Sequence, residues 1–258
     1  MVHPEHFGAG WVSPVVAYAM AAAGAALGLR CTVRALAAEG AARRNWLLTA
    51  SVAIGSGIWT MHFIAMLGFT VGGSAIRYDV SLTLLSLLIA VAVVGAGLFT
   101  VGLFGQDRRW PLLAGGIGTG VGVAAMHYLG MAALRLHGEI TYDTTLVSLS
   151  VVIAIVAATA ALWAALTVRG VTGTVLASLV MGAAVSSMHY TGMFSVSVEL
   201  APDHAPLTGA TAMEFIFPLA VALGSFLFLT SAFVALSPAA RRRRPVAEPM
   251  DDVELPAL

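Results

Sequence analysis

Residues 55–66 read Gly55-Ser-Gly-Ile-Trp-Thr-Met-His-Phe-Ile-Ala-Met66, and this pattern recurs twice further along the chain. The second copy is Gly120-Val-Gly-Val-Ala-Ala-Met-His-Tyr-Leu-Gly-Met131, and the third is Gly182-Ala-Ala-Val-Ser-Ser-Met-His-Tyr-Thr-Gly-Met193. The copies align without gaps and begin 65 and 62 residues apart. Self-similarity at a nearly fixed period indicates an internal repeat, so the chain contains a triplicated unit.

The composition of the chain requires lipid as its solvent. Of its 258 residues, 59% are hydrophobic and 10% are charged, and the mean hydropathy is +0.91. One soluble core cannot bury so much apolar surface, whereas a helix of about 20 apolar residues crosses the hydrocarbon layer. Seven stretches are long enough: Trp11 to Arg30, Asn45 to Phe69, Val80 to Phe104, Trp110 to Leu134, Thr144 to Val168, Thr174 to Val198 and Met213 to Leu236.

These stretches predict an all-α, polytopic membrane protein embedded in the lipid bilayer. Uninterrupted apolar runs exclude the alternating pattern of a membrane barrel. The motif copies lie on the second, fourth and sixth spans, so all three enter the membrane in the same direction. We therefore expect three parallel two-helix repeats plus one helix within residues 11–236. Residues 1–10 form an exterior tail, and residues 237–258 form a polybasic and acidic tail that we expect to be disordered.

The arginines predict the orientation in the membrane. All 13 basic residues are arginine, which together with abundant alanine suggests a bacterial genome rich in G and C. Only Arg77 and Arg135 fall on one side, whereas 11 arginines fall on the other. Because basic loops stay in the cytoplasm, we expect an inner-membrane protein with its N-terminus outside and its C-terminus in the cytoplasm. The 11 are Arg30, Arg34, Arg43, Arg44, Arg108, Arg109, Arg169 and Arg241 to Arg244.

One face of each motif helix carries the repeated residues, because residues four and seven apart lie close together around a helix. Small residues on this face let membrane helices approach closely, so we expect it to point into the bundle. It holds the glycine seven before each histidine (Gly55, Gly120, Gly182), the small residue three after it (Ala65, Gly130, Gly192), the histidine and the second methionine.

Each motif offers an imidazole and a thioether on adjoining turns, and these are candidate metal ligands. A lone histidine in a membrane helix is often a packing element, but three at one depth with few carboxylates nearby need hydrogen-bond acceptors or a shared ion, which favours a metal site. With a single cysteine there can be no thiolate cluster. Thioether with imidazole favours copper over magnesium, calcium or manganese, and zinc would also draw on cysteine or carboxylate. The expected ligand pairs are His62 with Met66, His127 with Met131, and His189 with Met193.

Other residues are weaker candidates. The first methionines, Met61, Met126 and Met188, lie about 140° around the helix from the second ones, so they either bind metal between helices or simply pack. His3 and His6 form a possible metal-capture pair on the N-terminal tail. We also expect loop ion pairs among Arg77, Asp79, Arg135 and Asp143. Three of these lie in a tail that the first two units share, Ile76-Arg-Tyr-Asp79 and Ile140-Thr-Tyr-Asp143.

The motif resembles that of the bacterial MHYT domain. Met188-His189-Tyr190-Thr191 spells its signature, and Met126-His127-Tyr128 and Met61-His62-Phe63 are similar to its sister copies, although Phe63 lacks the phenol. The resemblance covers residues 11–236. It implies a membrane sensor that holds copper through methionine and histidine and detects oxygen, carbon monoxide or nitric oxide.

Many proteins of that family continue into a cyclic-di-nucleotide synthase or phosphodiesterase, a kinase or a DNA-binding domain. This chain ends at Leu258. We therefore expect a sensor with neither enzymatic activity nor nucleic-acid binding of its own, which reports to a separate cytoplasmic partner. Two alternatives remain open: a haem protein, since histidine-bearing helices also clasp porphyrins, and a protein that transports or handles copper.

Overall fold

The computed structural model describes residues 10–72, 74–103, 109–201 and 206–237, within which seven helices are long and apolar enough to cross a membrane. The chain is a multi-pass membrane protein of the all-α class. Its helices are α1 (Val12–Leu36), α2 (Gly40–Met66), α3 (Val80–Leu103), α4 (Arg109–Ala132), α5 (Thr144–Thr167), α6 (Val171–Phe194) and α7 (Phe217–Leu236).

The helices match the seven expected spans and differ from them at the ends. Helix α1 continues past Arg30 to Leu36, and α2 begins at Gly40, before Asn45. Both helices therefore extend into the segment that was expected to be a loop. The expected end of the sixth span at Val198 is wrong, because α6 ends at Phe194 and a strand follows from Val196. Val196, Val198 and Leu200 alternate with polar residues, a period typical of strands.

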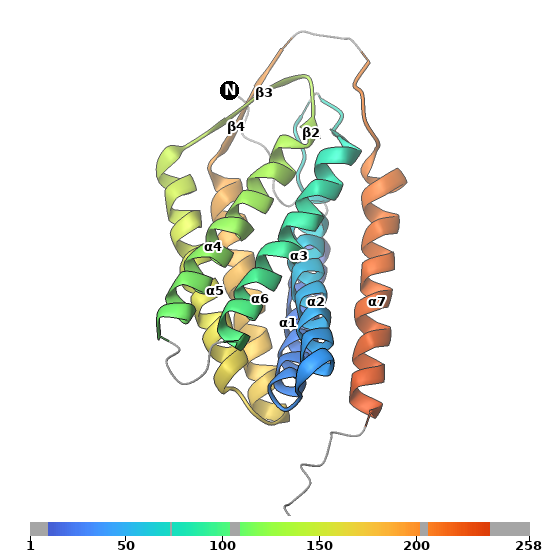
Figure 1. The fold of residues 1–258 in the computed structure, drawn as a ribbon. Coiled ribbons are helices and arrows are strands. Elements are labelled where there is room, and N and C mark those ends of the chain that lie inside the picture. The colour runs from blue at the N-terminus through green and yellow to red at the C-terminus, as the bar shows by residue number, and fades with distance from the viewer. Residues whose placement is uncertain (1–9, 73, 104–108, 202–205, 238–258) are drawn as a thin grey trace, which may run out of the picture.

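Helices α1 to α6 form a closed ring in chain order, in which α6 packs against α1 (Figure 1). Helix α7 lies outside this six-helix ring, against α1 and α2. The motif helices α2, α4 and α6 therefore alternate with the outer helices α3, α5 and α1. The third outer position is filled by the first helix of the chain instead of the helix that follows the third motif.

The repeated glycines show this pseudo-threefold arrangement at atomic detail. A Cβ at residue 120 would lie 2.4 Å from a backbone carbon of α5, so the two helices are in backbone contact there. Each of the three glycines faces the outer helix beside it. The contacts are Gly55 with Val91 of α3, Gly120 with Ile155 of α5, and Gly182 with Ala22 of α1.

Short strands join the repeats at one end of the bundle, here called the strand end (Figure 1). Strand β1 (Arg77–Tyr78) pairs with β2 (Leu134–Arg135), and β3 (Gly138–Tyr142) pairs with β4 (Val196–Leu200), both antiparallel. A π-helical turn, η1 (Ala212–Ile216), leads into α7. At the opposite end, here called the arginine end, Arg34 donates hydrogen bonds to the carbonyls of Val234 (2.6 Å) and Ser237 (2.8 Å).

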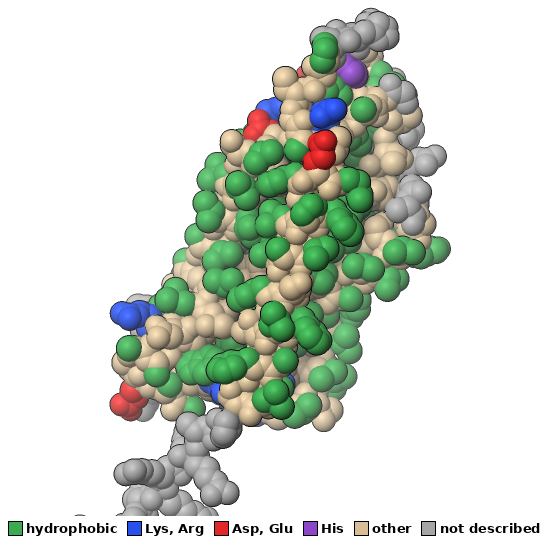
Figure 2. Space-filling model, turned by 90° about the vertical axis from the view of Figure 1, so that its right-hand side faces the viewer, with side chains coloured by type: hydrophobic (Ala, Val, Ile, Leu, Met, Phe, Trp, Pro, Cys, Tyr) green, Lys and Arg blue, Asp and Glu red, His purple; other side chains and the backbone are tan. Residues whose placement is uncertain are grey.

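The outer surface fits a lipid environment. Figure 2 shows hydrophobic side chains covering the middle of the molecule, with arginines and carboxylates gathered towards its two ends. Leu88, Val156, Val180 and Phe228 are among the exposed apolar residues of this zone. In a membrane these side chains contact acyl chains, so they need no protein partner.

Candidate metal centre

Three histidine side chains from α2, α4 and α6 meet inside the six-helix ring. His62, His127 and His189 are each only 1% exposed. Their Nδ1 atoms form a triangle, with distances of 3.0 Å between His62 and His189, 3.1 Å between His62 and His127, and 3.3 Å between His127 and His189. The rings meet edge to face, with centroids 4.8 to 5.2 Å apart. This group is called the histidine cluster below.

Neutral imidazoles alone cannot satisfy this triangle. Nδ1 of a neutral imidazole is either a hydrogen-bond donor or an acceptor, so among three atoms in mutual contact at least one pair must be alike. Two like nitrogens facing each other in a buried site are costly. A cation at the centre removes the conflict, because all three lone pairs then point at the ion.

The spacing of the nitrogens also fits one shared ion. Metal–imidazole bonds of about 2.0 Å place three ligand nitrogens about 3.3 to 3.5 Å apart. The observed separations of 3.0 to 3.3 Å are close to that range. The three histidines are the one group of metal-binding side chains of suitable spacing among the described histidine, cysteine and acidic residues. The cluster is therefore able to hold a metal ion.

Packing, more than hydrogen bonding, fixes the outer edges of two of the rings. Nε2 of His62 would lie 2.5 Å from a Cβ at residue 130, and Nε2 of His127 would lie 2.5 Å from a Cβ at residue 192. Neither Nε2 has a hydrogen-bond partner. Gly130 and Gly192 thus leave room for the histidine of the preceding copy. The first copy has Ala65 at the matching position.

The six motif methionines are buried, and their thioethers occupy two environments. Met66, Met131 and Met193 lie one turn beyond the histidines towards the strand end and belong to one apolar cluster. Met126 and Met188 belong to the same cluster, whereas Met61 packs with Ala17, Ala21 and Ala65. The first methionines are therefore not equivalent in their surroundings.

The family described as a bacterial signalling protein N-terminal repeat, MHYT, matches residues 55–116 and 120–178. The chain carries two matched MHYT repeats. The third copy begins after the matched residues, yet the structure places its His189 in the same cluster as the histidines of the first two.

The curated relatives of this MHYT chain are larger signalling proteins. It is 44% identical over 174 residues to the bifunctional diguanylate cyclase/cyclic di-GMP phosphodiesterase MucR of Pseudomonas aeruginosa, covering 65% of this chain and 25% of that protein. It is 41% identical over 172 residues to the cyclic di-GMP phosphodiesterase NbdA of the same species, covering 64% and 21%. The signaling protein YkoW of Bacillus subtilis is 31% identical over 172 residues, covering 62% and 20%. The chain thus spans a quarter or less of these relatives. No solved structure matches it.

The aromatic residue of each of the first two MHYT motifs contacts a tyrosine from the shared loop tail. Phe63 lies edge-on to Tyr78, with ring centroids 6.1 Å apart, and Tyr128 lies edge-on to Tyr142 at 5.9 Å. Burial raises the pKa of the Tyr78 phenol, so it stays protonated at neutral pH. The recurrence of Ile-x-Tyr-Asp was the sequence signal for this pair of aromatic contacts, but the contacts themselves did not follow from the residues.

The phenol that Phe63 lacks is replaced by a tryptophan one turn earlier. In the second copy the Tyr128 hydroxyl is hydrogen-bonded to Ser150 of α5 at 2.7 Å. In the first copy Trp59 Nε1 donates to the matching serine, Ser86 of α3, at 2.9 Å. Both copies therefore tie the motif helix to its outer helix.

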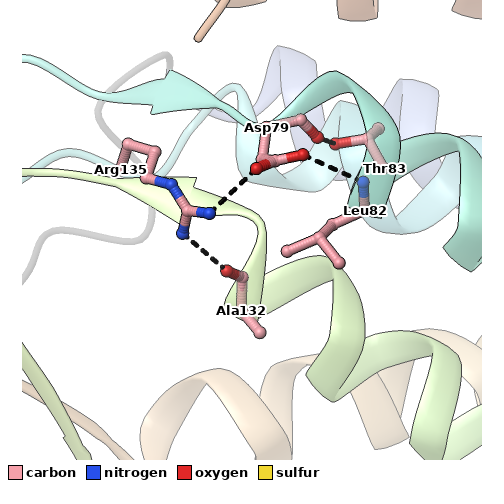
Figure 3. Close-up of polar contacts among 5 residues, drawn as sticks. All are labelled: Asp79, Leu82, Thr83, Ala132 and Arg135. Atoms are coloured by element: carbon pink, nitrogen blue, oxygen red, sulfur yellow. Dashed lines mark hydrogen bonds and ion pairs between the residues drawn. The ribbon is translucent and has the colours of Figure 1, made fainter. Parts of the chain in front are cut away.

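The loop charges that follow the first two copies connect the repeats (Figure 3). Asp79 accepts a hydrogen bond from the backbone N–H of Leu82 and caps α3, and its other oxygen pairs with Arg135 at 2.9 Å. Arg135 also donates to the carbonyl of Ala132 at the end of α4. The expected ion pair is confirmed for Asp79 and Arg135, whereas Asp143 caps α5 through Leu146 and Arg77 donates to Gly209.

The chain has four histidines besides those of the cluster. His137 lies in the loop at the strand end. His3, His6 and His204 lie outside the described residues, as do the tail segments 1–9 and 238–258.

Proposed function

We propose that this MHYT chain is a membrane-embedded sensor domain in which His62, His127 and His189 together hold one copper ion. The convergence of three buried Nδ1 atoms on one point is the observation that carries this proposal. Detection of oxygen, carbon monoxide or nitric oxide at that ion, and transfer of the signal to a separate cytoplasmic partner, complete the proposed role. The matched MHYT repeats and the signalling relatives support the sensory part.

The choice of copper follows from the donor atoms available around the cluster. Imidazole suits zinc, copper, iron and nickel, whereas thioether sulfur selects copper in its reduced state. Each motif also carries a buried methionine one turn after its histidine. These methionines are Met66, Met131 and Met193. Bound copper would supply a redox-active centre that can take a small additional ligand.

The residues of the chain have three tasks in this proposal. The histidines offer neutral nitrogens, because burial among apolar helices disfavours the charged imidazolium. Gly130 and Gly192 hold two of the rings in place. Met66, Met131, Met193 and Tyr78, which are all almost completely buried, separate the cluster from the strand end.

The geometry disfavours the two alternatives. Nδ1 atoms 3.0 to 3.3 Å apart leave no space for a porphyrin between the rings, as axial haem ligation needs. Below the cluster, towards the arginine end, Thr119 is the one polar residue among the described residues lining the interior cavity. A transported ion would meet no charged or histidine side chain among these lining residues, although the thioethers of Met181 and Met188 also line the cavity.

Copper analysis of the purified protein tests the proposal. After reconstitution with copper and removal of unbound metal, mass spectrometry should find about one copper per chain in the wild type. His62→Ala, His127→Ala and His189→Ala should each lose most of it. The matched control is His137→Ala, which removes a histidine outside the cluster and should keep full copper. Trace copper in the wild type, or unchanged copper in the three variants, would overturn the proposal.

A separate variant tests the thioethers. Replacing Met66, Met131 and Met193 together with leucine keeps the apolar volume and removes the sulfur. If the sulfurs bind copper, affinity for Cu(I) should fall by at least tenfold while affinity for Cu(II) changes little. Equal Cu(I) affinity would assign the methionines to packing and leave the histidine cluster as the whole site.

A further inference from the structure

An apolar cavity lies on the same axis as the histidine cluster. Its volume is ≈ 70 Å³, and it lies inside the six-helix ring. Three of its lining residues are those four positions before each histidine, and three more are those eight positions before. Because four residues rise about 6 Å along a helix, the cavity begins one turn below the cluster, towards the arginine end. The two layers are Ile58, Val123 and Val185, and then Ile54, Thr119 and Met181.

The cavity exists because the three outer helices differ at one equivalent position. The contacts of the repeated glycines make Val91, Ile155 and Ala22 equivalent. Three residues further along, α3 carries Val94, whereas α5 carries Ala158 and α1 carries Ala25. All three line the cavity and are buried. Two alanines at positions where α3 has valine leave volume that no side chain fills.

The lining cannot hold ordered water. A buried water needs two to four polar partners. The one polar lining residue, Thr119, directs its hydroxyl to the carbonyl of Val93 at 3.3 Å. Larger apolar cavities of about 150 Å³ stay dry and take up benzene or xenon. A cavity of ≈ 70 Å³ therefore suits a molecule of only a few heavy atoms.

We propose that this axial cavity is a binding site for a small apolar molecule of the size of a diatomic gas. Ile58, Val123 and Val185, which line the cavity, lie one helical turn before the three histidines of the cluster. The cavity concentrates such a molecule from the surrounding lipid, next to the cluster. This role beside a metal rests on the proposed function, but the binding itself needs no metal.

Xenon is the probe that tests the binding. In the full-length protein in lipid nanodiscs, the ¹²⁹Xe chemical shift should change with xenon pressure in a saturable way, above the linear change of empty nanodiscs. Ala158→Val makes α5 match α3 at this layer and should abolish the saturable part. Ala25→Val does the same on α1 and gives a second test if the first variant fails to fold. The matched control is Ala160→Val, because Ala160 is an exposed residue of α5.

The results separate this inference from the proposed function. Loss of saturable binding in Ala158→Val or Ala25→Val, with wild-type behaviour in Ala160→Val, supports the cavity site. A wild type without saturable binding, or cavity variants that bind like the control, overturns it. Copper content is measured in the same samples. Full copper without xenon binding would refute the cavity alone, and xenon binding without copper would refute the metal proposal alone.

Discussion

His62 is positioned by the absence of a side chain at residue 130. A Cβ at residue 130 would lie 2.5 Å from Nε2 of His62. The imidazole could not move away from it, because the side chain is almost completely buried. The same relation holds between His127 and Gly192. Two of the ligands thus depend on residues that bind nothing themselves.

Gly130→Ala should therefore weaken metal binding without removing a ligand. The added methyl group displaces the imidazole of His62 from the triangle, and changes that reorient a metal-bound histidine cost about 10- to 100-fold in affinity. Competition with a chelator of known affinity measures the effect. Gly118→Ala is the control on the same helix, since a Cβ at residue 118 meets nothing within 4 Å. Equal affinities in the two variants would show that the glycine does not position the ring.

Asp79 should make thermal stability depend on acidity. The backbone N–H of Leu82 is the main cause that lowers the pKa of Asp79 below its usual value, and Arg135 adds to it. A lowered folded pKa favours the ionised form, so the stabilisation is present above the pKa of the unfolded chain and is lost as pH falls through the folded pKa. Asp79→Ala should lower the midpoint of thermal unfolding by a few degrees at pH 7, measured in detergent.

Asp79→Asn separates the two contributions of this residue. The amide oxygen still caps α3 but cannot pair with Arg135, so its midpoint at pH 7 should lie between those of wild type and Asp79→Ala. The difference between wild type and Asp79→Asn should shrink as the pH is lowered towards 3. A difference independent of pH would contradict an ionised Asp79 as its source.

At the scale of helices and strands, hydrophobic length predicted seven spans, and the structure confirms them. The sixth span was predicted to end too late for a physical reason. Val196 and Val198 are apolar residues that would suit a membrane helix, but they alternate with polar residues and lie in β4, which pairs with β3. The position of α1 beside α6 could not be predicted either. Chain order placed a helix after each motif, whereas in the structure α6 packs against α1, with Gly182 facing Ala22.

The glycines between motif and outer helices should differ in their tolerance of alanine. A Cβ at residue 120 would lie 2.4 Å from the Ile155 backbone, whereas at residue 182 the nearest atom is 3.2 Å away. Gly120→Ala should therefore destabilise the protein by about 1 to 3 kcal/mol, the range for overpacking, and Gly182→Ala by less. Thermal unfolding of the two variants in one detergent measures the difference. The reverse order would contradict the observed helix spacing.

At the scale of the whole molecule, the charge asymmetry predicts which end faces the cytoplasm. In bacterial cells, Glu139→Cys at the strand end should react with a membrane-impermeant maleimide from outside. Arg169→Cys at the arginine end should react only after the membrane is permeabilised. The native Cys31 is completely buried, so it adds little background. Labelling of Arg169→Cys in intact cells would reverse the proposed orientation.

The sequence predicted that the motif histidines share one depth, but not how they meet. Spacing and helical period place His62, His127 and His189 on matching faces of parallel helices, which is enough to expect a common site. The contacts between their Nδ1 atoms depend on the radius of the six-helix ring and on how His62 and His127 pack against Gly130 and Gly192. The sequence pattern does not specify these distances. The second methionine of each copy was expected to be an equal ligand, and that expectation stays a prediction.

X-ray absorption at the copper edge of the reconstituted protein tests the central claim most directly. Three histidines around one ion predict three nitrogen neighbours at about 2.0 Å, with the outer-shell scattering of imidazole rings. The triple variant with His62, His127 and His189 replaced by alanine should lose this signal. A copper site without imidazole scattering, or one that is unchanged in the triple variant, would contradict the account.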